Sequence, residues 1–260
     1  MTALLSGIPI QPVSFERTLA KLKTWLAAPG CRRVATVNTS FLTQCETNPE
    51  LLRALRTADH VTADGHPVVW LARLAGLQVP ERVAGSDLVW PLLEEAARTG
   101  ARVYFLGASE GTLQKLEAKL HARGLFPRVC GSYTGRVDLD DEAHCTELAE
   151  DVSARRTDLL LVALGCPKQD LFLSRYGTQT GARLSLGIGA TLDFLAGTRR
   201  RAPGVWQRAR LEWLFRWTQE PGRLTGRYLA DLGFLVRRLL GHACAPRARR
   251  ARGLPRHHSR

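Results

Sequence analysis

The chain has 260 residues, of which 45% are hydrophobic and 23% are charged, and it carries a formal net charge of +13. These proportions are typical of a soluble globular protein and exclude a fibrous or wholly disordered chain. No stretch reaches the roughly 18 consecutive apolar residues that a membrane-spanning helix requires, which argues against an integral membrane protein.

The N-terminal segment and the cysteines both point to the cytoplasm. Residues 1–18 lack a basic stretch ahead of their short apolar run, so we expect no secretory signal. The six cysteines are scattered along the chain without a C-x-x-C pair. This spacing argues against a zinc site or a disulfide framework and fits a reducing cytosol.

Short apolar runs alternate with helical patterns over the first 190 residues. The runs predict strands at 34–37, 60–65 (the weakest), 103–106, 159–164 and 184–188, and the intervening segments predict helices at 49–58, 110–123 and 141–156. Strands that are apolar throughout imply a parallel sheet covered by helices on both faces. The sequence therefore predicts an α/β fold with a Rossmann-like, doubly wound, mainly parallel sheet.

The character of the chain changes after Gly197. Residues 199–260 hold 16 arginines, no lysine and only three acidic residues, so this segment accounts for the whole net charge. Such asymmetry suggests a neutral body that carries a basic element for a polyanion, whether nucleic acid, anionic lipid or a phosphorylated substrate.

Within this basic segment, residues 211–240 predict two amphipathic helices interrupted at Pro221 and Gly222. A basic linker precedes them, and the residues after Leu240 include almost no large apolar side chain, so we expect a disordered tail. The predicted organisation is a Rossmann-like catalytic body (1–197), a basic amphipathic helical appendage (198–240) and a basic tail (241–260).

Aromatic residues are interleaved with the arginines of the appendage, at Trp206, Trp213, Phe215, Trp217, Tyr228 and Phe234. A merely solvated basic face would not carry these rings, whereas aromatic side chains favour the boundary between membrane and water. Trp213 and Trp217 lie four residues apart on one helix face, and packing against the body is an equally good interpretation for them.

Polar and glycine residues follow most of the predicted strands, where a doubly wound sheet binds its ligands. They are Thr36 and Asn38, Asp64, the 107–111 turn with Gly107, the 165–169 turn with Gln169, and the 187–193 turn with Asp193. Each is weak alone, because an Asp after a strand is often a turn former and Ser109 can simply cap a helix. Together they predict one ligand-binding crevice.

Several familiar motifs are missing. The turns match neither G-x-G-x-x-G nor a P-loop, so a dinucleotide or ATP site of the usual kind is not supported. The histidines show no H-x-x-x-H spacing, and the segment 138–141, the nearest approach to D-x-D, precedes a helix and is better explained as a capped turn. We therefore expect neither a metal nor another cofactor.

The same strand-end segments carry a family resemblance. From Val34 to about Arg227 the chain resembles the WecG/TagA/CpsF glycosyltransferases (glycosyltransferase family 26), which move an N-acetylhexosamine-type sugar from a UDP donor to a lipid-diphosphate-linked sugar. The matching segments are VATVNTSFL, TADGHPVVW, ERVAGSDL, VYFLGASEGT, LLVALGCPKQDLF, GIGATLDFLAG, RRAPGVWQ and LEWLFRWTQEPGRL. The resemblance implies a GT-E-type body and a basic appendage that touches the membrane surface and completes the active site.

The resemblance also implies roles for individual residues. Asp64 matches the family's proposed catalytic base, and Thr36 and Asn38 match polar residues beside the donor sugar. The full predicted set comprises Asp64, Thr36, Arg216 and Arg223 as catalytic residues, and Asn38, Arg82, Gly107, Gln169, Asp193 and Arg227 as substrate-binding residues. Arg216 and Arg223 match arginines assigned to the diphosphates.

Two departures from the family pattern stand out. The T-x-N-P-E form of some members is T-V-N-T-S here, which removes a carboxylate beside Asn38 and bears on the choice of donor sugar. The arginine expected near position 226 is replaced by Gly226, with Arg227 next to it.

The function that the resemblance implies is inverting transfer of a sugar, with ManNAc or its uronic acid favoured, to an undecaprenyl-diphosphate-linked GlcNAc-type acceptor in cell-surface polysaccharide synthesis. A carboxylate can accept the proton of the attacking hydroxyl, and arginines can stabilise the departing UDP. The implied partners are the UDP-sugar, the lipid-linked acceptor and an anionic membrane, at whose inner face the enzyme would lie peripherally. We expect no nucleic acid, and homo-oligomerisation stays open.

Two alternatives compete with this interpretation. The arginine-rich appendage could belong to a nucleic-acid-binding protein, although the body is neutral and carries no known nucleic-acid motif. The sheet could equally serve a nucleotide-dependent oxidoreductase, since fold alone does not decide function, but the dinucleotide fingerprint is absent.

Overall fold

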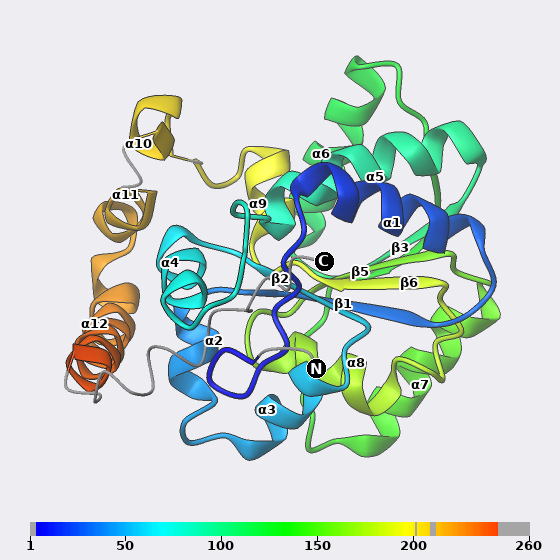
Figure 1. The fold of residues 1–260 in the computed structure, drawn as a ribbon. Helices are drawn as coiled ribbons and strands as arrows, with labels where there is room; N and C mark the ends of the chain where they lie inside the picture. Colours follow the sequence, from blue (N-terminus) through cyan, green and yellow to red (C-terminus); the bar gives the residue numbers. More distant parts are fainter. Residues whose placement is uncertain (1–3, 201, 209–211, 244–260) are drawn as a thin grey trace, which may run out of the picture.

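Within residues 4–200, 202–208 and 212–243, which this computed structural model describes, six strands form one all-parallel sheet (Figure 1). The strands are β1 (Arg32–Val37), β2 (His60–Ala63), β3 (Arg102–Gly107), β4 (Arg128–Tyr133), β5 (Leu159–Ala163) and β6 (Leu184–Gly187). Their order across the sheet is β2-β1-β6-β5-β3-β4, so β2 and β4 are the two edges.

Helices cover both faces of the sheet, as Figure 1 shows. One face carries α1 (Phe15–Ala27), α5 (Gly85–Thr99), α6 (Glu110–Ala122) and α9 (Thr191–Ala196); the other carries α2 (Thr39–Gln44), α3 (Pro49–Arg56), α4 (His66–Leu74), α7 (Glu142–Ala154) and α8 (Lys168–Tyr176). Alternate residues of β5 divide between two buried clusters, with Leu159 and Leu161 in one and Leu160 and Val162 in the other. The predicted Rossmann-like α/β fold is confirmed.

Side-chain caps begin several helices where the sequence leaves a strand or a turn. The carboxyl, amide or hydroxyl oxygens of Ser14, Asn48, Ser109 and Asp141 each accept a hydrogen bond from a backbone N–H in the first helical turn. The caps at Ser109 and Asp141 confirm the predicted capped turns ahead of α6 and α7.

The edge strand β4 is absent from the sequence prediction. Its residues are partly exposed, and its register against β3 shifts between Val103 and Tyr104. A short strand that begins with Arg128, includes Gly131 and buries little of its surface lacks the apolar run by which the central strands were predicted.

The described part of the appendage contains α10 (Gly204–Arg208), α11 (Glu212–Gln219) and α12 (Pro221–Ala243). They lie along one side of the body, where α12 packs against α2 (Figure 1). The predicted break is present, because α11 ends just before Pro221 and α12 begins there. Two details of the prediction are wrong: the linker contains the short helix α10, and α12 continues to Ala243 rather than ending at Leu240. Residues 244–260 of the expected tail lie outside the described residues.

The helix α12 is attached to the body by its inner face. Phe234 is fully buried in the cluster that also contains Phe41 and Leu42 of α2. The buried carboxylate of Asp231 accepts a hydrogen bond of 2.8 Å from Thr43 Oγ1. Among the described helices, none combines the length and the hydropathy needed to span a bilayer.

Candidate active site

Asp64 lies at the carboxyl end of the edge strand β2. Its backbone N–H donates to the Val37 carbonyl oxygen (2.8 Å), which holds it beside the end of β1. Gly65 follows with a φ of 133°, which a residue with a Cβ rarely adopts, so the chain turns at once into α4. The Asp64 side chain therefore stays at the mouth of the sheet with 28% of its surface accessible.

Positive and negative groups surround this carboxyl. Arg82 Nη1 lies 3.7 Å from Asp64 Oδ1, and Arg82 Nη2 lies 2.6 Å from Asp87 Oδ2, so one guanidinium joins two carboxylates. Although Asp64 keeps some access to solvent, protein atoms surround it on most sides, and this burial raises its pKa to about 6. The charges of Arg82 and Arg216 lower the pKa of Asp64, and Asp87 opposes them. A carboxyl that titrates near neutrality suits a general base.

The end of β1 places two further predicted residues close by. Thr36 is buried, and a Cβ on Gly85 at the start of α5 would lie 3.1 Å from its Oγ1, so α5 approaches Thr36 closely and a larger residue at position 85 would press on this hydroxyl. Asn38 caps α2 by accepting a hydrogen bond from Ser40 N (3.0 Å) through Oδ1. Its amide nitrogen donates to no other side chain that the structure describes, so this group can serve a ligand.

Two predicted substrate-binding residues hold the turns of the crevice. Gln169 is buried and its Oε1 accepts a hydrogen bond of 2.8 Å from Gly189 N, which fixes the turn between β6 and α9. Gly107 has a φ of 89°, and a Cβ on it would lie 3.0 Å from the carbonyl carbon of Ala163 in β5. In the structure both residues support the backbone that a ligand would meet.

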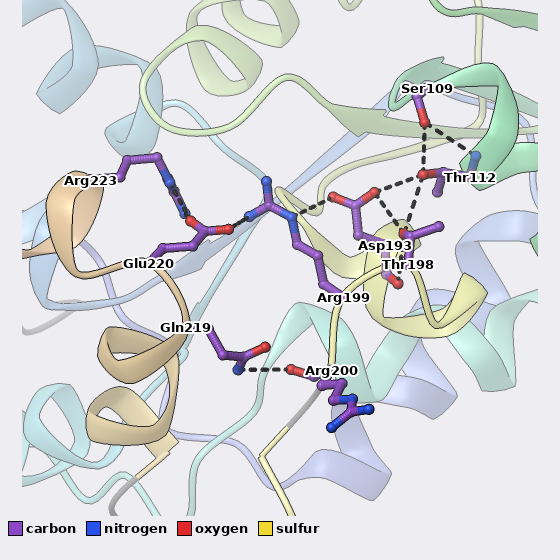
Figure 2. Close-up of polar contacts among 9 residues, drawn as sticks. All are labelled: Ser109, Thr112, Asp193, Thr198, Arg199, Arg200, Gln219, Glu220 and Arg223. Carbon is purple, nitrogen blue, oxygen red and sulfur yellow. Dashed lines mark hydrogen bonds and ion pairs between the residues drawn. The ribbon is translucent and has the colours of Figure 1, made fainter.

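Asp193 lies in a chain of polar contacts that joins the body to the appendage (Figure 2). Its Oδ1 accepts a hydrogen bond from Thr112 Oγ1 (2.9 Å), and its Oδ2 lies 3.4 Å from Arg199 Nε. Arg199 Nη1 then pairs with Glu220 Oε1 at 2.7 Å, and Glu220 pairs in turn with Arg223 of α12. The predicted residues Asp193 and Arg223 are thus connected through two residues that the sequence prediction omits.

The three predicted arginines of the appendage make different contacts, and of these three Arg216 contacts a residue of the body. Arg216 stacks over the Phe194 ring, with its guanidinium carbon 4.8 Å from the ring centroid, and its charge acts on Asp64. Arg223 is held by Glu220. Arg227 lies over its neighbour Tyr228, and its charge lowers the pKa of Cys166, which follows β5, against the stronger raising effect of burial.

Sequence reasoning misses several residues of this site for different reasons. Asp87 lies inside the matching segment ERVAGSDL, and its spacing of five from Arg82 at the start of a helix was the available signal. Arg199 belongs to a run of three arginines, and Glu220 has no neighbouring motif, so only the three-dimensional arrangement identifies them.

Metal-ligating groups do not gather in the part of the chain that the structure describes: it contains no group of three or more His, Cys, Asp or Glu side chains placed to hold an ion. The D-x-D-like segment is occupied by local hydrogen bonds, because Asp138 Oδ1 accepts from Asp140 N and Asp141 Oδ1 accepts from His144 N.

Two comparisons with known proteins identify the family of this chain. The sequence matches the model of the family described as "Glycosyl transferase WecG/TagA/CpsF family" over residues 3–249. It is also 30% identical, over 190 residues, to a protein of Bacillus spizizenii named N-acetylglucosaminyldiphosphoundecaprenol N-acetyl-beta-D-mannosaminyltransferase. The aligned region covers 73% of this chain and 72% of that relative.

Proposed function

Because the chain belongs to the WecG/TagA/CpsF family of glycosyltransferases, we propose that it moves an N-acetylhexosamine-type sugar from UDP to an undecaprenyl-diphosphate-linked GlcNAc-type acceptor. The family and the relative both indicate a hexosyltransferase. This class of enzyme argues against the two alternative functions, nucleic-acid binding and nucleotide-dependent oxidoreduction. The donor sugar that we favour is ManNAc or its uronic acid, since the Bacillus relative is named as an N-acetylmannosaminyltransferase. The observation that carries the proposal is the Asp64 carboxyl at the mouth of the sheet, which pairs with Arg82 and whose pKa the charge of Arg216 lowers.

In the proposed reaction Asp64 accepts the proton of the acceptor hydroxyl while the hydroxyl oxygen bonds to the anomeric carbon. The bond between that carbon and the β-phosphate oxygen breaks, and UDP leaves with the electron pair, so the anomeric configuration inverts. Negative charge develops on the β-phosphate, and the guanidinium of Arg216 is placed to stabilise it, since arginine binds phosphate oxygens bidentately.

The glycine turns of the central strands support a donor site beside Asp64. Gly107 ends β3, Gly165 and Gly189 follow β5 and β6, and all three have positive φ angles. Such turns let the backbone approach a ligand closely, and they lie at the carboxyl edge where open α/β sheets bind nucleotides. We therefore place UDP over these strands, with its sugar directed towards β1 and Asp64.

The proposed function is tested by incubating the full-length chain with UDP-ManNAc, its uronic acid, UDP-GlcNAc or UDP-glucose and a short-chain lipid diphosphate bearing GlcNAc. Mass measurement should show an acceptor one sugar heavier, with release of UDP, for one of the first two donors. EDTA should leave the rate unchanged, because arginines supply the charge that a metal would otherwise supply. A large loss restored by magnesium or manganese would contradict metal independence, and the absence of product from every donor would contradict the proposed reaction.

The activity should depend on pH through Asp64. Burial raises the pKa of Asp64 to about 6, so kcat/KM should fall on the acidic side of that pH, by about tenfold per unit. The sign follows from the role of the group, since only the ionised carboxylate can accept the acceptor's proton. A rate profile between pH 4 and pH 9 checks this, and a flat profile down to pH 4.5 would exclude Asp64 as the base.

We further propose that the appendage rests on an anionic membrane at the inner face of the cell. Four apolar residues form an exposed stripe on α12, opposite the buried Phe234: Leu229, Leu232, Val236 and Leu240. The half-exposed Trp213 contacts Tyr228 edge to face, and Trp217 Nε1 donates to Thr225, so these two tryptophans join α11 to α12. An apolar stripe among arginines is the pattern of a helix that lies in the membrane interface.

The stripe can be tested with a double substitution, Leu229→Glu and Leu240→Glu. Each leucine contributes roughly 1.5–3 kcal/mol when it enters an apolar phase, so binding to phosphatidylglycerol vesicles should fall at least tenfold in a flotation assay. Transfer to a short-chain acceptor should persist. Phe126→Glu is the matched control, because Phe126 is equally exposed on the body. Undiminished vesicle binding by the double variant would contradict the proposal.

A further inference from the structure

A surface cavity of about 230 Å³ lies between α4 and the segment that precedes α5. Trp70 and Arg73 of α4 line one side, and Glu81 and Arg82 line the other. The mechanism proposed above uses Arg82 alone among these residues. Trp70 is 47% exposed, the largest exposed aromatic residue on this side of the body.

This cavity adjoins the catalytic carboxyl. Arg82 lines the cavity and also lies 3.7 Å from Asp64, so its guanidinium is common to the cavity and the base. His66, two residues after Asp64, lines the same cavity at the start of α4. A ligand in this cavity would therefore lie next to the group that takes the proton.

The order of the strands indicates which of the two substrates, donor or acceptor, lies on the cavity side of Asp64. An in-line displacement places the base, the attacking oxygen, the anomeric carbon and the leaving phosphate in sequence. The glycine turns proposed for UDP follow β6, β5 and β3, whereas Asp64 follows β2 at the edge of the sheet. The donor thus extends from Asp64 across the sheet, and the acceptor must approach from the β2 side. There the segment before α5 runs along β2, with Val83 N donating to the Ala63 carbonyl oxygen (2.9 Å), and forms one wall of the cavity.

The walls of the cavity are already held in place. Arg73 donates to the carbonyl oxygens of Val79 (2.8 Å) and Pro80 (2.6 Å), which fixes the loop against α4. Glu81 Oε1 accepts a hydrogen bond of 2.7 Å from Phe15 N, which ties the same loop to α1. A site with preset walls needs little rearrangement on binding.

The size and the chemistry of the cavity fit one sugar ring. Its volume lies below the range of about 300–1,000 Å³ of pockets for drug-sized ligands, so it is too small for a nucleotide sugar. An exposed indole offers a flat apolar surface for the C–H face of a pyranose, and the guanidinium of Arg82 can donate to sugar oxygens.

We propose that this cavity is the subsite for the acceptor's GlcNAc-type sugar, with Trp70 as the platform against which its ring packs. This inference rests on the proposed function, since it assigns the acceptor of that reaction to a place. Trp70 is a substrate-positioning residue: it orients the attacking hydroxyl towards Asp64 and takes no part in proton transfer.

The test uses the full-length Trp70→Ala and Trp70→Phe variants with a short-chain lipid diphosphate bearing GlcNAc. Loss of the indole should raise the KM for this acceptor by about tenfold, leave the KM for the UDP-sugar unchanged, and be largely restored by phenylalanine. The control is Trp90→Phe, because Trp90 lies on α5, where its Nε1 donates to Glu94 and its ring faces Arg123. This control should leave both KM values unchanged.

Three other results would overturn the assignment: an unchanged acceptor KM in Trp70→Ala, loss of vesicle binding alone, and a change in oligomeric state alone. The last two would make Trp70 a membrane contact or an interface between copies. Saturation-transfer NMR with the acceptor analogue and no donor separates this inference from the proposed reaction. If no UDP-sugar yields product, weaker acceptor binding by Trp70→Ala still supports the subsite, and equal or undetectable binding by the wild type and the variant overturns it.

Discussion

Replacing Asp64 with asparagine should lower kcat by about 10²–10⁴-fold while the affinity for UDP stays unchanged. The amide is nearly isosteric with the carboxyl but cannot accept the acceptor's proton. Asp64 makes its nearest side-chain contact with Arg82 at 3.7 Å, so loss of its charge removes only a loose ion pair from the fold. Steady-state rates, UDP binding by calorimetry and circular dichroism together check the result.

The matched control for this variant is Asp87→Asn. Asp87 shares the Arg82 guanidinium with Asp64, and its negative charge raises the pKa of Asp64. Its removal should therefore move the acidic limb of the kcat/KM profile to lower pH while most of the turnover is kept. Near-normal turnover by the Asp64 variant, or an equal loss in both variants, would remove Asp64 from the role of base.

Replacing Arg216 with glutamine should lower kcat by about 10²–10³-fold, the usual effect of removing one group that stabilises transition-state charge. The same substitution should also shift the pH dependence of the rate in a defined direction. The charge of Arg216 lowers the pKa of Asp64, so its loss should raise that pKa and move the acidic limb of the profile to higher pH. Rates measured across pH 4–9 with saturating acceptor give both the fall in kcat and the shift of the acidic limb.

Arg223→Gln is the informative comparison for this prediction. Arg223 pairs with Glu220, and Asp64 receives no resolved influence from it, so its loss should leave the acidic limb where it is. If the limb of the Arg216 variant also stays in place, Arg216 does not face Asp64 during catalysis. If both variants keep normal turnover, the appendage contributes no charge to the reaction.

The central strands and the position of Asp64 could be predicted because local pattern determines them. β5 is apolar on both faces and β6 is buried throughout. Every parallel strand ends at the same edge, so residues after strands must gather there. The edge strand β4 buries little surface, and no period in its sequence distinguishes it from a loop.

The partners of the appendage arginines could not be predicted, since they depend on how α12 packs. Phe234 and Asp231, together with the ion pairs of Arg237 and Arg238 to Glu46, set its position against α2. This packing lets the charge of Arg216 act on Asp64 while Arg223 pairs with Glu220. Gln169 shows a different limit of prediction from sequence. A glutamine can bind a substrate or hold the backbone, and the sequence does not distinguish these roles, whereas in the structure its side chain accepts a hydrogen bond from Gly189 N.

The attachment of α12 makes the appendage a local folding unit with its own opening equilibrium. One buried ring contributes roughly 1.5–3 kcal/mol, and one charge-assisted hydrogen bond contributes a similar amount. The partly exposed ion pairs of Glu220 with Arg199 and of Glu46 with Arg237 and Arg238 add at most about 1 kcal/mol each, before the entropy of ordering the helix is subtracted. Opening at Phe234 and Asp231 therefore requires less free energy than unfolding of the sheet. Because an open molecule lacks Arg216 beside Asp64, the observed turnover is the turnover of the closed form multiplied by its population. Mild denaturant or heat should thus abolish the transferase activity while the parallel sheet is still folded.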